Sequence, residues 1–270
     1  MNETEVQEAC DRLKIEAAIH SVEELRGLIA CMDLTTLEGT DTPEKIRRLC
    51  AKAVAPPHAP SCAAVCVYPR FVTCACEALR GSKVKVASVA AGFPSGQMLL
   101  EIKLAEIRAA VASGSDEMDV VLDRGSFLSG DFAAVTDEIV AMKRACGKAP
   151  LKVILETGEL GDLEQIRRAS ELAIEGGADF IKTSTGKIAP GATLPAVWVM
   201  CEAIREEFRK SGKRVGLKPA GGIRKVADAV AYVRLVRELL GKDWIGPELF
   251  RMGASSLLDA VLKEIQQSIA

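Results

Sequence analysis

The chain has 270 residues, with 35 lysines and arginines against 37 aspartates and glutamates, which gives a formal net charge of −2. That balance argues against a nucleic-acid or membrane surface as the main partner. Hydrophobic residues make up 49% of the chain and aromatic residues 4%. The core is therefore aliphatic, which suits parallel β/α layers whose sheet is covered on both faces.

The cysteines and histidines argue against several classes of site. Nine cysteines are scattered without a Cys-x-x-Cys pair, and the two histidines are His20 and His58, so a zinc cage or a disulfide framework is not expected. An odd number of thiols and the lack of a secretory signal indicate a reducing cytosol. The apolar runs are too short to cross a membrane. We expect a cytoplasmic protein with no metal and no cofactor.

Short apolar runs alternate with amphipathic segments along the chain. Residues 3–18 predict a helix, because Val6, Cys10 and Leu13 recur at helical spacing, and we expect this helix to cap one end of the fold. The predicted strands then run in order over 28–32, 63–67, 84–90, 117–122, 151–155, 178–181, 214–217 and 249–252. The predicted helices between and after them begin near 41, 69, 98, 131, 162, 194, 224 and 256.

Eight strand–helix units in strict alternation imply parallel pairing through right-handed crossovers. Eight units in about 250 residues fit a closed (β/α)8 barrel better than an open doubly wound sheet. No Gly-x-Gly-x-x-Gly fingerprint follows the first strand, which weakens a nucleotide-binding alternative. The predicted fold is an α/β protein with a single (β/α)8 barrel and an extra N-terminal helix, divided into a cap over 1–24 and a barrel over 25–270.

In such barrels the active site lies at the C-terminal ends of the strands. These ends carry polar residues and one glycine that are far apart in sequence and meet when the barrel closes. They are Asp33, Thr35, Cys66, Asp119, Glu156, Lys182, Thr185, Lys218, Gly253, Ser255 and Ser256.

Lys182 and Lys218 end adjacent strands and are the most informative pair. Two ammonium groups a few ångströms apart are not both charged cheaply, so one is pushed toward the free amine, a nucleophile toward carbonyls. Asp119 is placed to carry protons for such a reaction. Lys182 taken alone also fits a strand-end lysine whose ammonium reaches solvent; the three residues together favour catalysis.

Glycines and hydroxyls gather after the last three strands, at 184–186, 221–222 and 253–256. The last two groups lead into helices, whose free N–H groups and positive ends bind phosphate in many barrels. Each group alone also fits a tight turn or a helix cap. Beside the two lysines, the three groups together favour a phosphate site.

Several strand-end residues permit two interpretations. Cys66 lacks a histidine partner in any predicted site loop, so a small buried residue is the preferred interpretation over a nucleophile. Asp33 fits either a second carboxylate in a proton relay or a hydrogen-bonded strand end. Arg224 fits either a phosphate ligand or the start of a helix. Glu156 is interpreted as structural, and Lys187 as a solvated loop residue.

Seven segments of the chain resemble deoxyribose-phosphate aldolases, and the resemblance spans residues 25–263. The Lys-Thr-Ser-Thr-Gly and Lys-Pro-Ala-Gly-Gly motifs, in this order, are its most specific part. The seven segments are 32–37 (MDLTTL), 65–71 (VCVYPRF), 116–121 (DEMDVV), 155–160 (LETGEL), 180–186 (FIKTSTG), 216–224 (GLKPAGGIR) and 253–258 (GASSLL).

The resemblance implies a metal-free class I aldolase that reversibly cleaves 2-deoxy-D-ribose 5-phosphate to D-glyceraldehyde 3-phosphate and acetaldehyde. It implies Lys182 as the Schiff-base lysine, Lys218 as the second lysine that tunes it and takes part in proton transfer, and Asp119 as the proton donor and acceptor. The implied sugar contacts are Asp33, Thr35, Cys66 and Thr185. The implied phosphate contacts are Gly186, Gly221, Gly222, Gly253, Ser255 and Ser256, with Arg224 as a further candidate.

One departure from the family pattern concerns the C-terminus. Some bacterial members end in a tyrosine that assists proton removal, whereas this chain ends in QQSIA, so slower turnover is expected. Alternatives are a transaldolase or keto-acid aldolase, and a barrel with reduced or lost catalysis that acts as a protein-binding scaffold. Family members often form dimers, which leaves a homodimer open.

Overall fold

The computed structural model describes residues 3–269, and within them eight parallel strands form one sheet. Strands β1 to β7 pair in chain order, and β8 pairs with β1. Parallel bridges from Leu217 to Phe250 and from Ala220 to Gly253 join β7 to β8 and close the barrel. The strands are β1 (Met32–Thr35), β2 (Ala64–Val67), β3 (Lys85–Ala90), β4 (Glu117–Val121), β5 (Leu151–Ile154), β6 (Phe180–Lys182), β7 (Gly216–Lys218) and β8 (Met252–Ala254).

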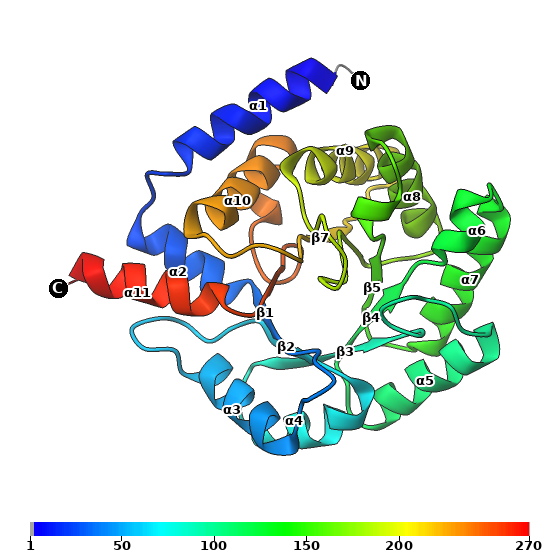
Figure 1. Cartoon of the computed structure of the whole chain (residues 1–270), viewed down its shortest axis with the longest axis horizontal. Coiled ribbons are helices and arrows are strands. Elements are labelled where there is room, and N and C mark those ends of the chain that lie inside the picture. Colours follow the sequence, from blue (N-terminus) through cyan, green and yellow to red (C-terminus); the bar gives the residue numbers. More distant parts are fainter. Residues whose placement is uncertain (1–2, 270) are drawn as a thin grey trace.

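The helices surround the strands as an outer ring, which confirms the predicted (β/α)8 barrel (Figure 1). Short 3-10 turns at Pro69–Phe71, Thr157–Glu159 and Lys242–Trp244 complete the connections. The helices are α1 (Glu3–Glu16), α2 (Val22–Ala30), α3 (Pro43–Val54), α4 (Val72–Ala78), α5 (Leu100–Ala112), α6 (Arg124–Leu128), α7 (Phe132–Ala145), α8 (Leu163–Glu175), α9 (Leu194–Ser211), α10 (Val226–Leu240) and α11 (Leu257–Ile269). No helix within residues 3–269 is long and apolar enough to cross a lipid bilayer.

Aliphatic side chains hold the helical ring against the outside of the barrel. Residues such as Val65, Val120 and Leu217 are fully buried between the strands and the helices, and burying a side chain of this kind contributes about 1.5–3 kcal/mol. A second, small apolar cluster of Leu37, Cys66, Ala87 and Val89 is separate from this large core. Polar and charged side chains of the other strands therefore share the barrel interior with small apolar groups.

The first predicted strand is wrong, because 28–30 is the end of helix α2 and β1 begins at Met32. Leu25, Leu28 and Ile29 form the buried face of α2, at the spacing that a helix requires. Ser21 and Glu24 form a reciprocal capping box at its N-terminus. A short apolar run is compatible with a strand or with a buried helix end, and here the capping box decides for the helix.

The N-terminal helix α1 packs against α10 and α9 on the outside of the helical ring (Figure 1). Its buried residues are Val6, Cys10 and Leu13, the helical stripe that the sequence indicated. Helix α1 therefore covers the side of the barrel and not an open end. The division of the chain into a cap over 1–24 and a barrel over 25–270 stays a prediction.

Candidate active site

A hollow of about 240 Å³ opens at the C-terminal ends of β1, β6, β7 and β8. Nine of the predicted site residues line it: Thr35, Lys182, Thr185, Gly186, Gly221, Gly222, Arg224, Gly253 and Ser255. Asp33, Cys66, Asp119 and Lys218 are fully buried. Ser256 is exposed on the turn before α11.

Lys182 and Lys218 are aligned neighbours in the β6–β7 register. Both amines point at one carboxylate: Nζ of Lys182 lies 2.8 Å and Nζ of Lys218 lies 2.7 Å from Oδ2 of Asp119. Lys218 also donates a hydrogen bond to Asp33. The thiol of Cys66 lies 4.0 Å from the same oxygen of Asp119. The barrel thus brings together the amines and carboxylates that the sequence placed on four different strands.

Three further charged residues, which the sequence analysis missed, extend this cluster. Lys152 on β5 lies 2.8 Å from Oδ1 of Asp119 and 2.6 Å from Oε2 of Glu117. Arg251, just before β8, lies 2.7 Å from Glu117 and 2.8 Å from Asp33. Lys152 is fully buried and the other two are nearly so. Buried charges require such partners, because an unpaired one is expensive in a low-dielectric interior.

The pairing keeps the carboxylates ionised and Lys218 charged. Burial alone would raise the pKa of Asp119, but Lys152, Lys182 and Lys218 together hold this pKa well below its usual range. Lys218, Arg251 and Lys152 likewise lower the pKa of Asp33 against the effect of burial. Burial opposes the charge of Lys218, yet Asp119 and Asp33 raise its pKa above the ordinary lysine value.

Cationic side chains outnumber carboxylates in this cluster. Among the described residues it contains the cations of Lys152, Lys182, Lys218 and Arg251 against Asp33, Glu117 and Asp119. Of these four cations, Lys182 is the one with a single carboxylate partner among the described residues. That partner is Asp119, which Lys152 and Lys218 also contact. Lys182 also lines the hollow, where a ligand reaches it. Lys182 is therefore the amine of this cluster with the fewest carboxylate partners, and it is the one that a ligand in the hollow reaches.

The glycine-rich wall of the hollow depends on close backbone contact between two loops. Gly221 has a left-handed backbone with φ of 85°, and a Cβ there would lie 3.2 Å from the Cα of Gly186. Gly186 is itself left-handed, with φ of 79°. A larger residue at either position would strain the backbone and separate the loops after β6 and β7. The glycines of the predicted phosphate motif therefore shape this wall.

Glu156 orders the loop that carries Thr185. Its carboxylate is buried and accepts hydrogen bonds from the hydroxyl and the backbone N–H of Thr185. Arg124 lies 3.4 Å from the same carboxylate. Burial raises the pKa of Glu156, while Thr185 and Arg124 act in the opposite direction. Glu156 also has a left-handed backbone with φ of 58°, which is uncommon outside glycine and concentrates at functional sites.

Two charged residues at the hollow were not predicted as site residues. Lys187, interpreted from sequence as solvated, lines the hollow and forms an ion pair with Glu38, with Nζ 2.9 Å from Oε1. Lys187 comes from the loop after β6 and Glu38 from the loop after β1. Their pairing depends on loop conformation, for which the sequence contains no periodic signal.

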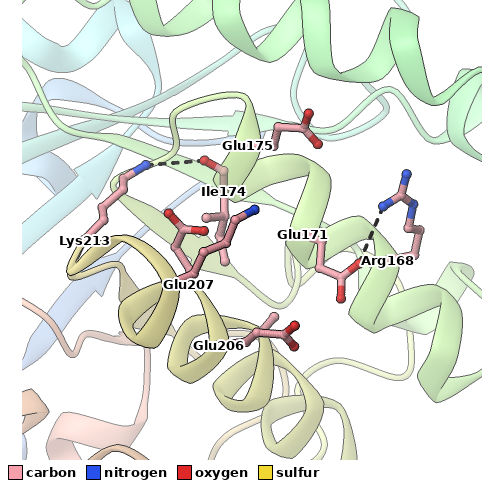
Figure 2. Close-up of a pocket in the computed structure, with 9 residues that line it drawn as sticks. Arg168, Glu171, Ile174, Glu175, Glu206, Glu207 and Lys213 are labelled. Carbon is pink, nitrogen blue, oxygen red and sulfur yellow. Dashed lines mark hydrogen bonds and ion pairs between the residues drawn. The ribbon is translucent and has the colours of Figure 1, made fainter.

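A larger hollow of about 590 Å³ lies between α8 and α9, on the outer ring (Figure 2). Glu171 and Glu175 from α8 meet Glu206 and Glu207 from α9 there. Lys213 donates to the carbonyl oxygen of Ile174. Arg168, Lys210 and Lys213 line this hollow beside these carboxylates, so its charges largely balance, and the cluster of buried lysines lies elsewhere, inside the barrel. The smaller hollow at the strand ends is therefore the candidate active site.

A closed (β/α)8 barrel with two lysines and a carboxylate converging beneath a hollow at its C-terminal end defines a class: barrel enzymes that use an amine nucleophile on carbonyl compounds. The model of the DeoC/LacD family aldolases matches residues 28–263. The chain belongs to the DeoC/LacD aldolase family.

Named relatives agree with this membership. The human deoxyribose-phosphate aldolase is 48% identical over 255 residues, which cover 89% of this chain and 80% of that protein. The enzyme of the same name from Agrobacterium fabrum is 47% identical over 239 residues, covering 87% and 88%. Among solved structures, the tetrameric deoxyribose phosphate aldolase of Aeropyrum pernix superposes with a TM-score of 0.72 at 27% identity, over the whole length of both chains.

Proposed function

We propose that the protein is a class I aldolase that reversibly cleaves 2-deoxy-D-ribose 5-phosphate to D-glyceraldehyde 3-phosphate and acetaldehyde, in deoxyribonucleotide catabolism. The observation that carries this proposal is the shared Oδ2 of Asp119, on which Lys182 and Lys218 converge beneath the hollow. The family and the relatives named deoxyribose-phosphate aldolase support the same reaction. Within residues 3–269 no observation favours the alternative, a barrel with reduced or lost catalysis that acts as a protein-binding scaffold.

The covalent step begins at Lys182. Its free amine attacks C1 of the open-chain sugar, and the resulting carbinolamine loses water to give an iminium ion. Asp119 takes the proton of the C3 hydroxyl, the C2–C3 bond breaks, and its electron pair enters the enamine. Glyceraldehyde 3-phosphate leaves, C2 takes up the proton from Asp119, and water hydrolyses the resulting iminium to release acetaldehyde and the free amine.

Asp119 and Lys218 support this sequence as proton carriers. Asp119 lies within hydrogen-bond distance of both amines, so a proton lost by Lys182 is accepted without a large movement. Lys218, kept charged by Asp119 and Asp33, supplies a positive charge beside the reacting nitrogen. That charge favours a neutral amine at Lys182 before the attack.

The substrate's two ends bind at different depths. Thr35 and Thr185 line the hollow near Lys182 and bind the sugar hydroxyls, while Asp33 and Cys66 contribute from the buried layer beneath. The phosphate binds against Gly186, Gly221, Gly222 and Gly253, with Ser255, Ser256 and Arg224 at the rim. Backbone N–H groups of such glycine-rich turns suit phosphate oxygens.

Two broader features belong to the same proposal. We place the protein in the cytosol, where its nine cysteines, all within the described residues, stay as the free thiols observed. We also propose a homodimer. The exposed apolar side chains of Met98, Leu99, Leu100 and Ile102 support an interface near the start of α5. Light scattering after gel filtration tests this state.

The activity is tested with the purified protein, 2-deoxy-D-ribose 5-phosphate and an excess of EDTA. Acetaldehyde and glyceraldehyde 3-phosphate should form, because the iminium and not a metal ion withdraws the electrons. Lys182→Met should abolish their formation, while Lys83→Met, at an exposed lysine, should leave it unchanged. Activity that depends on an added divalent metal, or that survives Lys182→Met, contradicts the proposal.

A further inference from the structure

An ion pair spans the mouth of the hollow. Oε1 of Glu38 lies 2.9 Å from Nζ of Lys187, and both residues line the hollow. The pair joins the loop after β1 to the loop after β6, two segments far apart in sequence. The Glu38 side chain is 59% exposed and that of Lys187 is 29% exposed. The ion pair therefore lies where a ligand enters the hollow, and a charged group of that ligand can replace one of its partners.

The position of Glu38 is fixed by the loop that carries it. The carboxylate of Asp41 is fully buried. It accepts hydrogen bonds from the backbone N–H of Glu38 at 2.9 Å and from the hydroxyl of Thr36 at 2.8 Å. Lys45 pairs with the same carboxylate. A loop tied at three points costs little further conformational entropy when Glu38 reaches Lys187.

Glu38 carries a negative charge in a hollow whose other charged residues are cations. Among the described residues that line it, the cations are Lys182, Lys187 and Arg224, and Glu38 is the one carboxylate. A carboxylate at the entrance repels a phosphate dianion and occupies the amine that would otherwise attract it. Glu38 therefore competes with the phosphate for Lys187 at the same place.

We propose that Glu38 is a specificity-determining residue, which the phosphate of the ligand must displace from Lys187. The inference rests on the proposed function, in which a phosphate monoester binds this hollow. In the free protein Glu38 neutralises Lys187, and in the complex the phosphate takes its place. Glu38 thus weakens the binding of phosphorylated ligands and leaves the binding of unphosphorylated sugars unaffected. It therefore reduces the difference in affinity between phosphorylated and unphosphorylated sugars.

The first test measures binding of inorganic phosphate by calorimetry, independently of catalysis. Glu38→Gln breaks an exposed ion pair and removes a charge of the same sign as the phosphate. The variant should therefore bind inorganic phosphate roughly threefold to fivefold more tightly than the wild type. Lys187→Met should weaken phosphate binding. The control Glu44→Gln removes the same charge from the exposed pair with Arg48 on α3 and should leave affinity at the wild-type value. Wild-type affinity in Glu38→Gln, an equal gain in the control, or unchanged affinity in Lys187→Met overturns the proposal.

A second measurement separates this inference from the proposed reaction. Reductive trapping of acetaldehyde on Lys182 requires no phosphate, so Glu38→Gln should trap at the wild-type rate. The KM for 2-deoxy-D-ribose 5-phosphate should fall in this variant, whereas the KM for unphosphorylated 2-deoxyribose should not change. If trapping fails in the wild type while phosphate binding still responds to Glu38→Gln, the reaction is wrong and the ion-pair role stands. If trapping succeeds and phosphate binding does not respond, the ion-pair role alone is wrong.

Discussion

Lys182 and Lys218 share one hydrogen-bond acceptor, the Oδ2 oxygen of Asp119, at 2.8 and 2.7 Å. Lys218 has a second carboxylate partner in Asp33, and Lys182 has none among the described residues. The two amines are therefore not equivalent, although they are aligned on adjacent strands. Two carboxylates hold Lys218 as the ammonium ion, whereas Lys182 has one carboxylate partner and lines the hollow.

Replacing Lys218 should slow imine formation at Lys182. In Lys218→Met, Asp119 loses one of its cations and binds the Lys182 ammonium more strongly, so the free amine becomes rarer. Trapping of acetaldehyde should fall about 100-fold or more at neutral pH, and the deficit should shrink as the pH rises. Lys83→Met is the control at an exposed position. Equal trapping rates for Lys218→Met and the wild type at neutral pH would show that Lys218 does not tune Lys182.

Removing Lys152 should destabilise the fold much more than removing a surface lysine. Lys152→Met leaves Glu117 and one oxygen of Asp119 without their nearest cation inside the barrel. Breaking a buried ion pair in this way costs about 3–5 kcal/mol. In the control Lys52→Met, a more exposed pair with Asp259 is lost, at a cost of about 1 kcal/mol or less. Urea unfolding measures both free energies, and similar losses in the two variants speak against a buried network.

The same network predicts how stability depends on pH. Cationic neighbours lower the pKa of Asp33, Asp119 and Glu117 in the folded state, in spite of burial. Their contribution is therefore fully present above the unfolded carboxyl pKa of about 4. It is lost as the pH falls through the lower folded values.

Asp33→Asn removes one of these carboxylates and so tests its contribution to stability alone. The variant should be less stable than the wild type at neutral pH, and the difference in unfolding free energy should narrow below about pH 4. Asp259→Asn, at an exposed carboxylate, should show little difference at any pH. Urea unfolding over the acidic range provides the comparison. If the difference in unfolding free energy between the wild type and Asp33→Asn stays constant on acidification, Asp33 is not held ionised by its neighbours.

A negative charge at Ser255 should discriminate between substrates. Ser255 lines the glycine-rich end of the hollow, so Ser255→Asp should repel a phosphate dianion and raise the KM for 2-deoxy-D-ribose 5-phosphate about tenfold or more. Unphosphorylated 2-deoxyribose should be affected less than twofold. Ser268→Asp on α11 serves as the control. Equal losses on both substrates would move the phosphate site away from Ser255.

The fold was predictable because its signals are local and repeated. Apolar runs followed by amphipathic segments recur through the chain, and Lys182 and Lys218 stand out because polar residues there end apolar strands. The error at β1 arose where this signal is ambiguous. The run at 28–30 fits a strand or a helix end, and the Ser21–Glu24 capping box distinguishes them.

The deeper part of the site was missed for a different reason. The predicted site residues lie mostly at the C-terminal ends of strands, whereas Glu117 and Lys152 lie nearer the N-terminal ends of β4 and β5 and pair with each other there. Alternation along β4 places Glu117 and Asp119 on the same face, and a lysine between Leu151 and Val153 is as unusual as Lys182. Both signals were available. The Glu38–Lys187 pair was not predictable, because it depends on two loop conformations.

The most direct test of the central claim is to map the lysine that forms the imine. The protein is incubated with acetaldehyde, reduced with borohydride, and analysed by intact mass and peptide mapping. We predict one reduced two-carbon adduct, located on Lys182, that is absent in Lys182→Met and retained in Lys187→Met. The absence of any adduct on the folded protein, or an adduct that persists in Lys182→Met, would contradict the account.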